Sequence, residues 1–306
     1  MFKESYNSSP KYNWADIRED VQNETPVETD FIGDDCYSKA EVEADLAKID
    51  RIKEQLGIGP ESGISDSRIQ EYAIAQEIGE MDWFGEEFRE DELFPDGEGT
   101  QTSIFLTSEF DDFVNHIDAI GLMQNADSNG EAIPFALDMT YNSTAEGLNK
   151  KMSWTHPDKK VRLPGFATAK YFEDTFNFDP LIQKGRIPIM PRFIIGFNPE
   201  LSTEITELRM SSSDWDSLRR DELTTKAKWC VLKELKHQSE QMLDYLEENH
   251  AKNDLLETAY TQVKALDKYF GGAIDAADEA DKNHPDWKSY ADRDDMAQAI
   301  IARNIF

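Results

Sequence analysis

Apolar and polar positions along this chain follow the period of helices in some segments and the length and pattern of strands in others. The first segment with a clear pattern is helical. Between residues 39 and 56, apolar side chains fall on one helix face, at Val42, Leu46, Ile49, Ile52 and Leu56. Ser38 and Glu41 have the spacing of a capping box ahead of this helix, and Gly57 follows its last apolar residue. We therefore predict a helix over 39–56, and a second helix over 66–88 from a mixture of apolar and polar positions.

The middle of the chain carries short apolar runs of strand length. They lie at residues 102–107, 117–123, 133–141 and 192–197. Asn125 to Gly130 has the composition of a turn, which predicts antiparallel pairing of the second and third runs. The fourth strand is predicted from Ile187 to Phe197, and Pro188 and Pro191 confine its regular pairing to 192–197. The runs lie among helical segments, so the predicted fold is α/β, with a mixed four-stranded sheet and flanking helices.

The last third of the chain is helical in pattern. Apolar positions predict a long amphipathic helix after Asp214, a second helix that ends at Gly271-Gly272, and a third over 286–303. Short connections between such helices are typical of antiparallel neighbours. The chain then divides into a disordered, polar N-terminal tail (1–35), a helical lead-in (36–64), an α/β core (65–212) and a helical C-terminal region (213–306).

Charge is distributed unevenly along the sequence. The net charge is −30, from 32 basic and 62 acidic residues, and an acidic surface repels nucleic acids and anionic membranes. The segment 149–172 is the exception, because it holds six basic residues against the single acid Asp158, a net charge of +5. Such a segment either faces solvent or meets a polyanion. The acidic remainder is explained by solubility alone or by docking of a basic protein partner.

Composition also bears on where the protein works. The sequence has no apolar run long enough to cross a membrane, and its first residues lack the apolar stretch of a signal peptide. Its two cysteines, Cys36 and Cys230, are too few to form a zinc site alone and are weak evidence for a disulfide framework. We therefore expect a cytoplasmic protein with no membrane partner.

Two aspartates stand inside the apolar runs, where an ionised carboxylate is costly to bury without a partner. Asp118 lies in the sequence Ile-Asp-Ala-Ile, and Asp138 lies in the sequence Leu-Asp-Met-Thr. Antiparallel pairing of the two strands would bring the carboxylates together, and their repulsion favours a bound divalent cation, Mg²⁺ or Mn²⁺. The alternative is that one or both aspartates end a strand and face solvent.

These two short sequences resemble motifs of the PD-(D/E)XK restriction-endonuclease-like superfamily, and the similarity covers residues 65–200. Members share a helix that carries a glutamate, a strand, a strand with an Ile-Asp-x-Ile core, and a strand that ends in Glu or Asp, any residue and Lys. The resemblance implies a nuclease-like core in which Asp118 and Asp138 bind the metal. It also implies a helical glutamate ligand, for which the candidates are Glu71, Glu77, Glu80 and Glu109; we take Glu77 as the predicted ligand.

The third motif departs from this family because Thr140 stands where the lysine is expected. In the family, that lysine helps to position the attacking water and stabilises charge at the phosphate, which threonine cannot do electrostatically. Lys150 and Lys151 are our candidates to replace it, with Lys170 as a further one. The predicted nucleic-acid contacts are Lys150, Lys151, Lys159, Lys160, Arg162 and Lys170.

Two functions from different classes follow from these observations. The first is a metal-dependent phosphodiesterase acting on DNA or RNA, with Asp118, Asp138, Lys150 and Lys151 as catalytic residues. A nucleic-acid-binding descendant that has lost the chemistry is a variant of this first function. The second is a non-enzymatic protein that docks a basic partner on its acidic surface. The two differ in whether the aspartates and a lysine converge on one metal.

Overall fold

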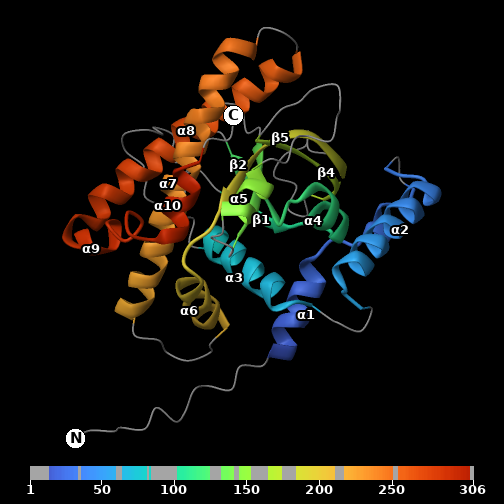
Figure 1. The fold of residues 1–306 in the computed structure, drawn as a ribbon, viewed down its shortest axis with the longest axis horizontal. Coiled ribbons are helices and arrows are strands. Elements are labelled where there is room, and N and C mark those ends of the chain that lie inside the picture. The colour runs from blue at the N-terminus through green and yellow to red at the C-terminus, as the bar shows by residue number, and fades with distance from the viewer. Residues whose placement is uncertain are drawn as a thin grey trace, which may run out of the picture.

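The computed structural model describes residues 14–33, 36–59, 64–80, 83, 102–124, 132–140, 145–152, 165–173, 184–210, 217–250 and 254–303. Within these residues, five strands form one mixed sheet with helices around it and a long helical region beside it (Figure 1). The strands are β1 (Thr102–Leu106), β2 (Ala119–Gln124), β3 (Ala132–Met139), β4 (Phe166–Phe172) and β5 (Gly185–Ile195). Their order across the sheet is β1-β2-β3-β5-β4.

The pairing of the strands is antiparallel except at one place. β1, β2 and β3 form an antiparallel meander, β5 joins β3 in parallel, and β4 pairs antiparallel with β5. The predicted antiparallel pair of 117–123 and 133–141 is confirmed, with Ala119 opposite Leu137. The predicted turn at 125–130 lies outside the described residues.

The expectation of four strands is wrong, because the basic segment 149–172 contains a fifth strand, β4. β5 begins at Gly185, two residues before the predicted start of the fourth strand at Ile187. Its first half pairs only with the edge strand β4, and the register shifts there. An irregular ladder at the sheet edge tolerates Pro188 and Pro191, which a central strand would not.

The helices up to the end of the α/β part run between and around the strands. They are α1 (Trp14–Glu24), the 3₁₀ turn η1 (Glu28–Phe31), α2 (Lys39–Leu56), α3 (Asp66–Glu80), α4 (Glu109–Asn115), α5 (Ala145–Met152) and α6 (Pro199–Met210). The expectation that 1–35 is disordered is wrong for α1 and η1. Val21 and Phe31 are buried there, so tertiary packing orders a segment that is polar overall.

The helix α2 has the ends that the sequence predicts. Ser38 and Glu41 form a complete capping box, and Gly57 closes the helix in the left-handed conformation with φ +72°. The second predicted helix, α3, begins at Asp66, and its described part ends at Glu80.

The C-terminal region is helical, as predicted, and its two long helices pack side by side. Its elements are α7 (Ser217–Asn249), α8 (Asp254–Ala280), the 3₁₀ turn η4 (Asp281–Asn283), α9 (Pro285–Lys288) and α10 (Asp295–Ile301). Gly271-Gly272 does not end α8, since burial of Phe270 and Ala273 on either side outweighs the low helix propensity of glycine. The third predicted helix is divided into α9 and α10. Among the described residues, no helix has the length and apolar character needed to span a membrane.

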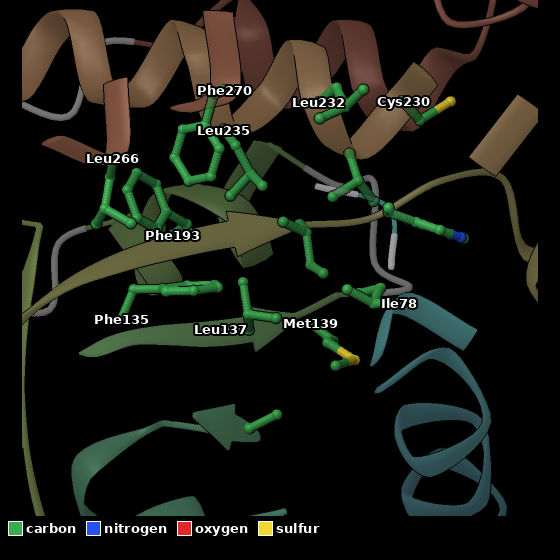
Figure 2. Packing of buried hydrophobic residues seen from close by; sticks show 14 of the residues in the cluster. Ile78, Phe135, Leu137, Met139, Phe193, Cys230, Leu232, Leu235, Leu266 and Phe270 are labelled. Atoms are coloured by element: carbon green, nitrogen blue, oxygen red, sulfur yellow. The ribbon is translucent and has the colours of Figure 1, made fainter. Parts of the chain in front are cut away.

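The sheet and the C-terminal helices share one hydrophobic core (Figure 2). Phe135 of β3 and Phe193 of β5 point toward α8, where each ring meets the ring of Phe270 edge to face. Side chains alternate between the two faces of a strand, so Asp138 lies on the face turned away from α7 and α8. On that opposite face Leu148 of α5 packs against Ile194 of β5. The candidate site therefore lies on the side of the sheet that α5 covers.

Candidate metal centre

Three carboxylates from different elements meet where β2 begins. They belong to Glu71 of α3, Asp112 of α4 and Asp118, which immediately precedes β2. One oxygen of each lies within 4.8 Å of the others. Asp118 is buried, and Glu71 and Asp112 are partly buried. Close carboxylate oxygens that face one point are suited to hold a divalent cation.

The short helix α4 places Asp112 beside Asp118. The side chain of Ser108 caps α4 and accepts a hydrogen bond from the backbone N–H of Asp111 at 3.2 Å. The helix ends at His116, whose backbone is left-handed with φ +56°, and the chain turns directly into β2. Asp112 and Asp118 therefore stand on either side of a tight reversal.

Asp111 fixes this helix to the edge strand β4. Its buried carboxylate accepts the backbone N–H of Lys170 at 2.8 Å and the backbone N–H of Tyr171 at 2.9 Å. The side-chain amide of Asn115 donates a further hydrogen bond at 2.6 Å. Burial raises the pKa of Asp111 to about 6, although these hydrogen bonds act in the opposite direction. Asp111 thus has a structural role next to the acidic triad.

The pKa values of all three triad carboxyl groups are raised above their ordinary values. Burial raises the pKa of Asp118 to about 7; Lys151 lowers it, and Asp138 raises it further. The pKa of Glu71 also lies well above its ordinary value, through burial and then the charge of Asp118. Burial likewise raises the pKa of Asp112. Hard carboxylate oxygens that bind protons this readily suit a hard divalent cation such as Mg²⁺ or Mn²⁺.

One arginine already contacts two members of the triad. A guanidinium nitrogen of Arg68 lies 3.4 Å from Oε2 of Glu71 and 3.7 Å from Oδ2 of Asp112. The same group donates to the backbone carbonyl of Asp118 at 3.2 Å and to that of Thr107. Arg68 therefore supplies one positive charge to the triad and ties α3 to the ends of β1 and β2.

Asp138 lies next to the triad but has different partners. Its carboxylate is almost completely buried, with the amine of Lys151 on Oδ1 and the guanidinium of Arg192 on Oδ2. Burial alone lowers the pKa of Lys151, but the charges of Asp138 and Asp118 outweigh it and the pKa is raised. Lys151 therefore remains a cation beside the triad. The structure thus brings Asp118, Asp138 and Lys151 close to one another.

The structure places Glu77, the glutamate chosen from the sequence, away from the triad. Glu77 is fully buried on another side of α3, where its Oε1 accepts a hydrogen bond from the hydroxyl of Thr224 at 2.8 Å. Glu77 follows Glu71 by six positions, which is more than one and a half helical turns. The two side chains therefore leave α3 in different directions. Glu109 is also placed elsewhere, in an ion pair with Lys53 at 2.7 Å. The side chain of Glu80 lies outside the described residues.

The basic segment is only partly described. The amine of Lys170 is already engaged within the protein. It is paired with Asp45 and lies 4.6 Å from the centroid of the Tyr37 ring. The side chain of Lys150 and the residues Lys159, Lys160 and Arg162 lie outside the described residues. Lys151 is the member of the predicted set whose contacts place it at the candidate site.

Three site residues were missed by reasoning from the sequence: Asp112, Arg68 and Arg192. The acidic run from Glu109 to Asp112, just after a strand, was the available signal for Asp112. Arg68 stands three positions before Glu71, which is the spacing of a helical ion pair. Nothing in the local sequence distinguishes Arg192, since its role depends on which strand lies beside β5.

Comparison of the chain with models of protein families, with curated proteins and with solved structures finds no match in any of the three.

Proposed function

We propose that this chain is a metal-dependent phosphodiesterase of the nuclease type, acting on DNA or RNA with Mg²⁺ or Mn²⁺. The observation that carries the proposal is the convergence of Glu71, Asp112 and Asp118 within 4.8 Å, with a cationic lysine beside them. The resemblance to the PD-(D/E)XK superfamily supports it, because α3, β1, β2 and β3 occur in the expected order, with the short helix α4 between β1 and β2. The helical glutamate in this proposal is Glu71 in place of Glu77.

The residues of the site fit such a cation by their chemistry. All three ligands are carboxylates, which are hard oxygen donors, and they come from separate elements that the fold holds in place. When bound, Mg²⁺ or Mn²⁺ would supply Lewis acidity at a phosphoryl oxygen and a water of lowered pKa. The triad would hold the ion, and Arg68 would keep Glu71 and Asp112 in position through the contacts described above.

Lys151 would act on the phosphate and the water. Its side chain is 31% exposed, so its amine is held at Asp138 while the residue still reaches the surface. In hydrolysis, the water oxygen forms a bond to phosphorus, one ester P–O bond breaks, and negative charge accumulates on the phosphoryl oxygens. A fixed ammonium group stabilises that charge. Thr140, in the position of the family lysine, has no charge to contribute.

A second candidate follows from the same contacts. Arg68 already pairs with two of the three carboxylates, and Asp138 is neutralised by Lys151 and Arg192. A site neutralised by its own side chains has less need of an ion, which favours a nucleic-acid-binding descendant without chemistry. The net charge of −30 keeps docking of a basic protein partner as the remaining alternative.

The proposal is tested by metal binding and cleavage measured on the same samples. We expect calorimetry with Mg²⁺ and with Mn²⁺ to give saturable binding, and we expect slow metal-dependent nicking of plasmid DNA or cleavage of labelled RNA at low salt. Asp118→Asn should lose both, whereas Asp50→Asn, an exposed aspartate of α2, should lose neither. Nucleic-acid binding without cleavage, whether or not metal binds, would support the second candidate. Absence of metal binding in the wild type would refute the phosphodiesterase.

A further inference from the structure

Asp138 is the residue whose surroundings differ most from a metal ligand. It is 2% exposed, and each of its carboxylate oxygens already accepts a hydrogen bond from a positively charged side chain. A buried carboxylate in such a pair has its charge compensated without an ion, and removal of either partner leaves an uncompensated charge. The oxygens of the neighbouring triad converge with one another, and Asp138 is not among them.

Arg192 is built into the structure around this carboxylate. It is 4% exposed and comes from β5, the parallel neighbour of β3. Besides Asp138, it donates to the backbone carbonyl of His116 at 3.1 Å and to that of Lys151 at 3.2 Å. The planar guanidinium fork is suited to such fixed, multiple contacts. Arg192 therefore joins the strand that carries Asp138, the turn before Asp118 and the end of α5.

Lys151 is held by two contacts on the same stretch of β3. Its amine donates to the carboxylate of Asp138 and to the backbone carbonyl of Met139. The backbone N–H of Met139 donates in turn to Oδ2 of Asp118 at 2.6 Å. Met139 therefore links the two groups: its carbonyl accepts from the amine of Lys151, and its N–H donates to the carboxylate of Asp118. This arrangement fixes where the amine stands relative to the triad.

We propose that Asp138 and Arg192 are positioning residues, which hold the amine of Lys151 beside the Glu71, Asp112 and Asp118 triad, and that Asp138 does not bind the metal. The inference rests on the proposed function and gives Asp138 a role different from the one its motif implies. Asp138 orients Lys151 by a direct ion pair. Arg192 holds Asp138 and the backbone of Lys151 in place.

The first test follows metal binding and turnover in three single variants and one double variant. We expect Asp118→Asn, which removes a ligand, to weaken Mn²⁺ binding clearly more than Asp138→Asn, whose effect is limited to the charge left on Lys151 and Arg192. In the cleavage assay, Asp138→Asn should lower kcat with little change in KM, down to the level of Lys151→Met. The double variant should be no slower than either single variant, since the two residues act as a unit. A loss of Mn²⁺ affinity in Asp138→Asn comparable to that in Asp118→Asn overturns the inference.

A second test needs no cleavage and no variant. Lysine amines are modified with a water-soluble acetylating reagent, and the modification of Lys151 is measured by mass spectrometry relative to Lys39, which is 74% exposed. The wild-type rate at Lys151 should be low and should stay low at saturating Mn²⁺. If Asp138 were a ligand, Mn²⁺ would draw it away and Lys151 would react several-fold faster.

The two tests separate the inference from the function on which it rests. Asp138→Asn, where it folds, should raise the labelling of Lys151 several-fold, and unchanged labelling would contradict the positioning role. Should that variant fail to fold, Asp138→Glu retains the charge and shifts its place by one methylene. It should keep Mn²⁺ affinity and lose turnover. Wild type that neither binds Mn²⁺ nor cleaves would refute the proposed function, even where the labelling still shows that Asp138 holds Lys151.

Discussion

The backbone N–H of Met139 donates a hydrogen bond of 2.6 Å to Oδ2 of Asp118, across 21 positions of sequence. This contact fixes the orientation of the central carboxylate of the triad to β3, which also carries Asp138. It depends on the register in which Ala119 faces Leu137. A shift of one residue would turn Asp118 to the opposite face of the sheet, so the register of β2 and β3 determines whether the triad exists.

Asp112 should prove to be a metal ligand although no sequence motif identifies it. Asp112→Asn removes one of the three converging carboxylates and should weaken Mn²⁺ binding by about tenfold or more in calorimetry. The matched control is Glu109→Gln in the same helix, because Glu109 pairs with Lys53 and should leave the affinity unchanged. Equal effects of the two substitutions would show that only the general acidity of α4 matters.

Metal binding should strengthen as the pH rises toward neutrality. Burial raises the pKa of Asp118 to about 7, so below that pH an ion must displace a proton before this carboxylate can bind it. We expect the Mn²⁺ affinity to rise by at least about tenfold per pH unit below about pH 7, because the pKa values of Glu71 and Asp112 are raised as well. Calorimetry in buffers of different ionisation enthalpy would count the released protons. An affinity independent of pH from about 5.5 to 8 would contradict this account.

Asp111 should make the protein less stable as the pH rises through the weakly acidic range. Its pKa is raised in the folded state to about 6, above the ordinary value of 3.8. Between these two values the unfolded chain ionises while folded Asp111 keeps its proton, so the free energy of unfolding falls, by about 3 kcal/mol at most. Asp111→Asn does not titrate. Denaturant unfolding from about pH 4 to pH 7 should therefore show the wild type losing stability relative to the variant.

The helical C-terminal region should prove inseparable from the sheet in stability. Phe270 of α8 is fully buried against the rings of Phe135 and Phe193, so Phe270→Ala should lower the free energy of unfolding by about 3–5 kcal/mol. The control, Leu56→Ala at a position 62% exposed, should change it by less than about 0.5 kcal/mol. Unfolding of the variant in two transitions, with the sheet intact in the first, would show that the region is a separate domain.

Local signals in the sequence determined several elements of the fold. Ser38, Glu41 and Gly57 set the ends of α2, because capping groups and a left-handed glycine act on the backbone beside them. The apolar runs around Asp118 and Asp138 predicted two antiparallel strands, and a carboxylate in an apolar strand marked a site that needs a partner. These inferences needed only residues that lie close together along the chain.

The partners of those carboxylates were decided by tertiary structure. Glu71, Asp112 and Asp118 meet because α3, α4 and β2 pack together, and Arg192 reaches Asp138 because β5 joins β3 in parallel. β4 and the continuation of α8 past Gly271-Gly272 likewise depend on a neighbouring strand or helix. A sequence pattern reports how each residue favours its own backbone and its own burial. It does not report which distant element will lie opposite, and that neighbour determines whether a buried acid meets other acids, a lysine or an arginine.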